Sequence, residues 1–203
     1  MSARIDIINQ ALIFLGADTI TGLDDDSSQA EIMNKIYALS RDSTLEAHEW
    51  SFAIRTFTPA VSTDPPSGHW TYSYPLPSDI IRLLEVDYGQ PTAAVGNNQI
   101  TRNQIAHEVQ GRNILTNDPI GFCTGIRRVE DEGIYTNLFC DAFSAKLAVK
   151  ACLAITESNT RLQSMAAMYA GYIQEAKSRD GQQGTTRRFR SRWLNNARRG
   201  FYG

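Results

Sequence analysis

The chain has 203 residues, of which 42% are hydrophobic and 21% are charged, proportions typical of a globular domain with an ordinary core. No apolar run approaches the roughly 18 residues of a membrane span, so we expect no membrane partner. The first residues lack the apolar core of a secretory signal, and none is expected. Three cysteines without Cys-x-x-Cys spacing argue against a disulfide framework and a zinc knuckle.

Charge is divided unevenly along the chain. Residues 177–203 hold eight basic side chains and one acid, Asp180, which gives this segment a net charge of +7. Since the whole chain has 20 basic and 22 acidic side chains, residues 1–176 carry 12 and 21, a net charge of −9. An acidic body with a basic end predicts an acidic or polyanionic partner for that end.

Two helices are predicted in the first quarter of the chain. Apolar side chains recur every three or four residues over 4–15, and Gly16 ends this helix. The second helix is predicted over about 28–49, because Ser28 lies three residues before Glu31, the spacing of a capping box.

The apolar period changes after Trp50. Residues 70–74 alternate between apolar and polar positions, and residues 80–86 are rich in branched apolar side chains, as in strands. From 89 to 128, short apolar pieces stand between Gly, Pro and Asn. The middle of the chain therefore predicts a small antiparallel sheet with loops.

Helical spacing returns at about Asn137 and continues, after a break near residues 158–160, as far as Ala176. Four amphipathic helices that each need a partner predict an α+β, mainly helical fold: a four-helix bundle with a β-rich insert between the second and third helices and an extended C-terminal tail. The first half of the bundle is expected at 1–51 and the β-rich insert at 52–128. The second half of the bundle is expected at 129–180 and the tail at 181–203.

No catalytic motif is found. His107-Glu108 begins like a zinc-protease motif, but Gly111 stands where the second histidine would be. Asp24-Asp25-Asp26 lacks the alternating ligands of a calcium loop. We therefore expect no enzymatic activity, no cofactor and no bound metal.

The basic tail also carries aromatic side chains. If the segment 185–199 forms a helix, Phe189, Trp193 and Leu194 fall on one stripe. Arginine with aromatic anchors is typical of protein interface hot spots and also of nucleic-acid-binding segments, and composition does not separate the two. The predicted binding residues are Arg187, Arg188, Phe189, Arg190, Arg192, Trp193, Leu194, Arg198, Arg199, Phe201 and Tyr202.

Three short motifs, in this order, resemble a known family. They are Ile8-Asn9-Gln10-Ala11-Leu12-Ile13-Phe14-Leu15-Gly16, the pair Arg41-Asp42 followed by Trp50-Ser51-Phe52-Ala53, and Tyr74-Pro75-Leu76-Pro77-Ser78-Asp79. Together they resemble the tail tubular protein A family, the head-to-tail adaptors of short-tailed bacteriophages. The resemblance covers about residues 5–85.

The resemblance implies a structural virion protein, made in the host cytoplasm, that forms a homo-oligomeric ring of about twelve subunits beneath the portal protein. Such a ring extends the channel through which double-stranded DNA passes and seats the tail nozzle protein. On this interpretation the C-terminal tail docks on the portal. The alternative is a nucleic-acid-binding module that uses the arginine and aromatic side chains of the tail.

The motif residues are expected to determine the fold. Trp50 and Phe52 are predicted to anchor the junction between the second helix and the sheet. Pro75 and Pro77, which follow Tyr74, are predicted to mark the entry to a strand. Asp79 is predicted to cap a local turn.

Overall fold

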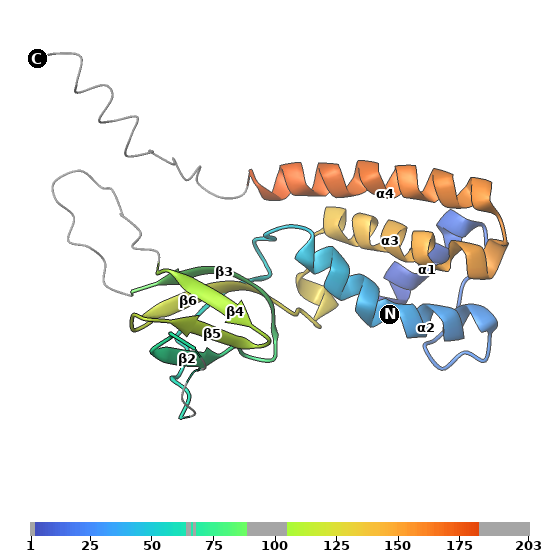
Figure 1. Cartoon of the computed structure of the whole chain (residues 1–203). Helices are drawn as coiled ribbons and strands as arrows, with labels where there is room; N and C mark the ends of the chain where they lie inside the picture. Colours follow the sequence, from blue (N-terminus) through green and yellow to red (C-terminus); the bar gives the residue numbers. More distant parts are fainter. Residues whose placement is uncertain (1–2, 64–65, 67, 89–104, 183–203) are drawn as a thin grey trace, which may run out of the picture.

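The computed structural model describes residues 3–63, 66, 68–88 and 105–182. A helical region and a β region lie side by side along the long axis of the molecule (Figure 1). The helices are α1 (Ala3–Leu15), α2 (Ser28–Glu46), α3 (Asn137–Thr156) and α4 (Asn159–Asp180), with a short 3-10 helix η1 (Glu132–Ile134) before α3.

The N-terminal ends of the longer helices are capped by hydroxyl side chains. The side chain of Ser27, one residue before the predicted cap, accepts a hydrogen bond from the backbone N–H of Ala30. Thr136 caps α3 and Ser158 caps α4 in the same way. Each cap satisfies an N–H group that the first turn of a helix leaves without a partner. The second helix therefore starts at Ser28, as predicted, and only its capping residue, Ser27, lies one position earlier than the capping-box spacing indicates.

The β region contains two antiparallel sheets of three strands. One has the order β1-β6-β3 and the other the order β2-β5-β4. β4 and β5 form a hairpin whose two-residue turn places Gly111 at a φ of 60°, a conformation that glycine adopts without strain. The strands are β1 (Ile54–Phe57), β2 (Tyr72–Pro75), β3 (Ile80–Asp87), β4 (His107–Gln110), β5 (Asn113–Thr116) and β6 (Phe122–Arg127).

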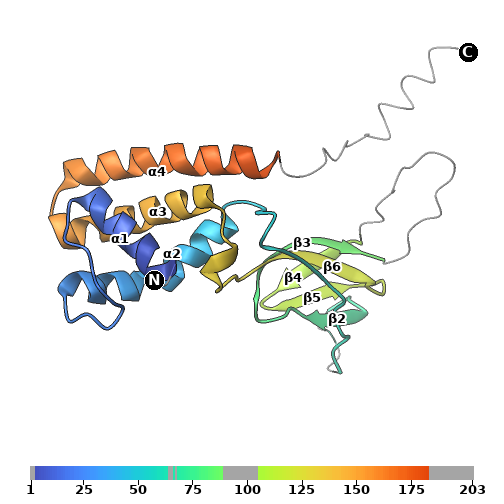
Figure 2. The same cartoon turned by 180° about the vertical axis from the view of Figure 1, so that it is seen from behind.

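The prediction of a four-helix bundle is wrong: the described residues form an α+β fold of four α-helices and two three-stranded sheets. α1, α2 and α4 each pack against α3, and α1 crosses α3 obliquely (Figure 2). The main core does not close among the helices, since it also contains Ala53, Ile126 and Val129 from the β region and its connections. The first sheet therefore forms one wall of the helical core.

A second, smaller core lies within the β region. It contains Tyr74, Val86, Ile114 and Cys123, which come from four different strands, together with Ile105 and Ile120. Because strand order follows neither the chain order nor a simple meander, these side chains meet only when distant segments pair. The β region thus has apolar contacts of its own in addition to the wall that it gives to the helical core.

A close approach of β3 to β6 leaves no space for a side chain at Gly125. A Cβ atom there would lie 2.9 Å from the carbonyl oxygen of Arg82 and 2.9 Å from Cγ2 of Ile80. We expect Gly125→Ala to lower the free energy of unfolding by about 1–3 kcal/mol, the usual range for overpacking. Urea unfolding followed by circular dichroism measures this change.

Gly171→Ala is the matched control, because no atom lies within 4 Å of the corresponding Cβ position on α4. Alanine at an exposed helical position stabilises by up to about 1 kcal/mol relative to glycine. The two substitutions should therefore change stability in opposite directions. Equal effects would contradict the packing seen between β3 and β6.

Candidate interaction sites

The junction between α2 and β1 is built on aromatic side chains. Trp50 is fully buried, and its indole Nε1–H donates a hydrogen bond of 3.0 Å to the carbonyl oxygen of Thr44. Its ring meets that of Phe139 edge to face, with centroids 5.0 Å apart. Phe52 packs against Phe139 and Tyr135. This cluster joins the end of α2 to the start of α3, and it has no exposed reactive group.

Tyr74 is buried in the β region, where its hydroxyl oxygen accepts a hydrogen bond from the backbone N–H of Ile120. Pro75 is the last residue of β2 and is exposed. The carbonyl oxygen of Pro77 accepts a bond from the N–H of Ile80 and closes the turn before β3. These positions hold the connection between the two sheets.

Asp79 acts between strands. Its carboxylate accepts a hydrogen bond from the guanidinium of Arg55 on β1, and its backbone carbonyl accepts a bond of 2.6 Å from the N–H of Arg128. Asp79 lies in the turn just before β3, and its side chain connects this turn to β1.

Asp180 is the last residue of α4, and its tertiary contact is one that no sequence motif indicates. Its carboxylate accepts hydrogen bonds from the backbone N–H and the hydroxyl of Ser51, the latter at 2.8 Å. An acidic group at the C-terminal end of a helix is unfavourable to the helix dipole. The contact with Ser51 offsets this cost and fastens the end of α4 to the α2–β1 junction.

His48 lies beside this contact. Its Nε2 atom is 3.5 Å from Oδ2 of Asp180, and its ring meets Trp50 edge to face. Burial lowers the pKa of His48 below its ordinary value, and this effect exceeds the opposing attraction of the Asp180 carboxylate. The ring is therefore neutral at pH 7, and Asp180 is held chiefly by Ser51.

We expect Asp180→Asn to lower the free energy of unfolding by about 2 kcal/mol, because an amide accepts with one oxygen only and hydrogen bonds to charged groups are the stronger ones. Glu175→Gln is the control, since Glu175 is exposed on the same helix and surface substitutions change stability by about 0.5 kcal/mol or less. Urea unfolding distinguishes the two. A loss as small as that of the control would mean that Asp180 does not fasten α4.

The predicted binding residues of the tail, from Arg187 to Tyr202, lie outside the described residues. What the structure does define is the point from which the tail begins: α4 ends at Asp180, beside Ser51.

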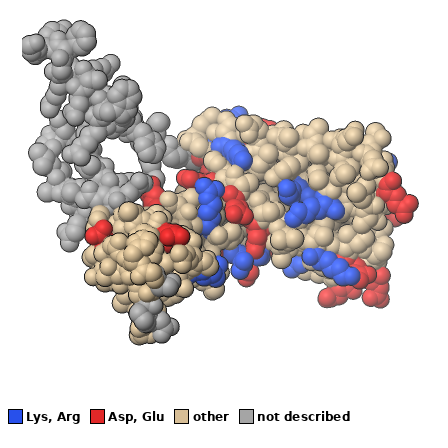
Figure 3. Space-filling view, in the orientation of Figure 1, with Lys and Arg blue, Asp and Glu red and all other residues tan. Residues whose placement is uncertain are grey.

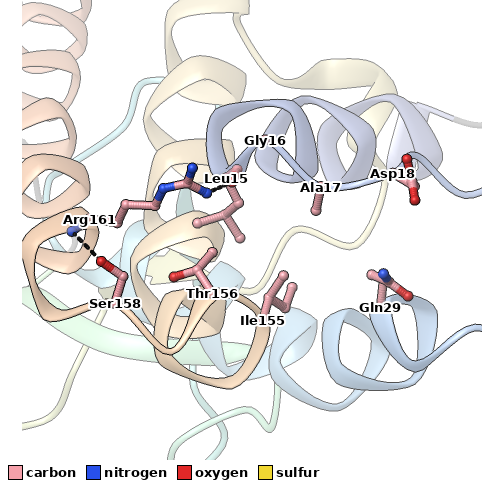
Figure 4. Close-up of a pocket in the computed structure, with 9 residues that line it drawn as sticks. All are labelled: Leu15, Gly16, Ala17, Asp18, Gln29, Ile155, Thr156, Ser158 and Arg161. Atoms are coloured by element: carbon pink, nitrogen blue, oxygen red, sulfur yellow. Dashed lines mark hydrogen bonds between the residues drawn. The ribbon is translucent and has the colours of Figure 1, made fainter.

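A pocket of about 520 Å³ lies between the end of α1 and the turn from α3 to α4 (Figure 4). Two of its polar side chains, Arg161 and Thr156, already have structural partners. Nη1 of Arg161 donates a hydrogen bond of 2.7 Å to the carbonyl oxygen of Leu15, and the hydroxyl of Thr156 donates to the carbonyl oxygen of Cys152. The residues around the pocket therefore connect the end of α1 to the α3–α4 turn.

The cysteines are not arranged for nucleophilic chemistry. Cys123 and Cys152 are fully buried. Burial raises the pKa of the Cys123 thiol to about 12 and that of Cys140 to about 11, so both remain protonated at pH 7, whereas the thiolate is the reactive form. Within the described residues no three His, Cys, Asp or Glu side chains are grouped to hold a metal ion. None of the described helices is long and apolar enough to span a bilayer.

No protein-family model matches the chain, and no curated protein is significantly similar to it. The fold and the sites described above define an α+β protein with a helical core, a sheet that forms one wall of it, and a basic segment that follows α4.

Proposed function

We propose that the protein is a subunit of the head-to-tail adaptor of a short-tailed bacteriophage. In this function about twelve copies form a ring beneath the portal protein, continue the DNA channel and seat the tail nozzle protein. The protein is structural, is made in the host cytoplasm and has its final location in the neck of the virion. The C-terminal tail docks each subunit on the portal.

The uneven charge carries this proposal. Residues 1–176 have a net charge of −9, and residues 177–203 have a net charge of +7. An acidic body repels the phosphates of DNA, so a ring of such bodies lets DNA pass without holding it. A basic segment with four aromatic side chains suits an acidic groove on a partner protein.

The positions of the motif residues support the same class of function. Trp50 and Phe52 lie in the aromatic junction, and Tyr74 and Pro77 lie at the connection between the two sheets. The three motifs that resemble the adaptor family therefore include residues that build the architecture. A likeness in such residues is a likeness of architecture, as expected for a structural subunit.

The test is the native mass of the purified protein, alone and mixed with the portal ring of the same phage. We expect a species of low copy number alone and about twelve copies on the portal. No association with the portal would contradict the adaptor function.

A second candidate function is direct binding of nucleic acid by the tail, favoured by its six arginines between residues 187 and 199. Arginines that neutralise six phosphates give a log–log dependence of affinity on salt with a slope of about −5. Binding of duplex DNA by the purified chain with such a slope, in the absence of portal binding, would favour this candidate.

A further inference from the structure

The outward face of α4 is unusual for an exposed helix. From Leu162 to Gln174 the helix carries no charged side chain. Much of the front of this helix, at the upper edge of the helical region, is free of charged groups in the space-filling view (Figure 3). Exposed helices of globular proteins ordinarily carry charged or long polar side chains on the side away from the core. The exposed residues between Leu162 and Gln174 are Gln163, Ser164, Ala166, Ala167, Ala170, Gly171 and Gln174.

Small side chains along such a face let a second helix approach closely. Ala167, Ala170 and Gly171 fall near the middle of the face, and the pattern of burial places all three away from α3. Helix axes pack 8–10 Å apart, and the smaller distances require small side chains at the contact. The α4 face is thus a shallow surface without a partner among the described residues.

A complementary surface lies on α2. Ile32, Ile36 and Leu39 form a stripe along one side of that helix, and Leu39 is 70% exposed. The first two pack at the margin of the main core, whereas Leu39 projects beyond it. α2 and α4 lie on opposite sides of α3 in both views (Figures 1 and 2). One copy therefore presents a protruding apolar stripe on one side and a flat, small-residue face on the other.

The charges of the two surfaces are also complementary. α2 holds Glu31, Asp42 and Glu46 against Lys35 and Arg41, a net charge of −1, and the loop before it adds three acidic side chains, Asp24, Asp25 and Asp26. α4 holds Arg161, Lys177 and Arg179 against Glu175 and the buried Asp180, a net charge of +1. Opposite net charge favours encounter between the α2 side and the α4 side and disfavours two α2 sides.

We propose that the α4 face of one copy receives the α2 stripe of a second copy, with Leu39 seated over Ala167. Because the two surfaces are different and lie on opposite sides of the subunit, the contact is heterologous. Repetition of a heterologous contact closes into a ring when its rotation permits. This assignment rests on the proposed adaptor ring and names the helical region as the part that joins neighbouring subunits.

Disulfide capture tests the contact directly. Leu39→Cys and Ala167→Cys are made as separate chains, each also carrying Cys140→Ser to remove the half-buried native thiol. The two chains are mixed at high concentration without portal, oxidised and examined for mixed dimers. Ile13→Cys mixed with Ala167→Cys is the matched control, because Ile13 is a comparably exposed apolar residue on α1.

We expect the 39/167 mixture to give at least about tenfold more mixed dimer than the 13/167 control, since a seated pair raises the local thiol concentration above that of random encounter. Equal amounts in the two mixtures would overturn the contact. So would Ala167→Cys chains that dimerise with one another more readily than with Leu39→Cys, which would indicate a two-fold contact. Loss of portal binding by Ala167→Glu, without preferential 39/167 capture, would assign the α4 face to the portal.

The failures of the two proposals can be told apart. If the wild-type chain assembles on the portal but 39/167 capture equals the control, the adaptor function stands and this contact is wrong. If 39/167 dimers form preferentially but the wild-type chain does not bind the portal, the contact stands and the adaptor function is wrong.

Discussion

Replacing Trp50 by alanine is expected to lower the free energy of unfolding by about 3–5 kcal/mol, the range for removing a large aromatic side chain from a core. Trp50 is fully buried, and its ring contacts those of His48, Phe52 and Phe139. Its loss also leaves the carbonyl oxygen of Thr44 without the indole donor. Since globular domains have a total free energy of unfolding of about 5–15 kcal/mol, this single change removes a large part of the stability of the fold.

Urea unfolding measures the effect, and two variants make it interpretable. Trp70→Ala removes the same side chain from a half-buried loop position and should cost much less. Trp50→Phe keeps most of the packing and removes the hydrogen bond, so its loss should lie between the two. A Trp50→Ala loss no larger than that of Trp70→Ala would contradict the role of the aromatic cluster as the joint between the helical region and the sheet.

The sequence predicts the helices well because their apolar spacing is a local property. The capping serine is displaced by one residue because Ser27 and Ser28 stand together and both suit the position. The strands from Tyr72 and from Ile80 follow from alternation and from turn residues. By contrast, β4 is exposed along its whole length, so no apolar pattern marks it.

The failure of the bundle prediction has a physical cause. Periodicity shows that a helix has an apolar face, but it does not show what that face meets. The core that contains Trp50 and Phe139 also contains Ile126 of β6 and Val129, which follows β6. These two residues reach the core only because β6 pairs with β1 and β3. Such pairings join residues far apart in sequence and leave no local signal.

The contact of Asp180 with Ser51 is another long-range feature that the sequence does not reveal. The two residues are separated by most of the chain, and no spacing rule connects them. In a charge count Asp180 is simply the one acid of a basic segment. Only the fold shows that its carboxylate contacts Ser51 at the α2–β1 junction.

Removing the residues after Gly181 is expected to abolish docking on the portal while leaving the fold intact, because α4 and its contact with Ser51 remain in the shortened chain. Within the tail, Trp193→Ala should weaken docking by at least about 2 kcal/mol if the indole is an interface anchor, which is roughly a 30-fold rise in Kd. Titration of the portal ring with labelled chains, at two salt concentrations, measures both effects.

Salt dependence decides what the tail binds. Docking through aromatic anchors is dominated by apolar burial and should weaken only modestly as salt rises, whereas six arginine–phosphate contacts predict a slope of about −5. Trp70→Ala is the control for the loss of a tryptophan outside the tail. If the chain ending at Gly181 binds the portal as tightly as the full chain, the tail is not the docking element. If the shortened chain instead loses a steeply salt-dependent affinity for duplex DNA, the arginine and aromatic side chains of the tail bind nucleic acid.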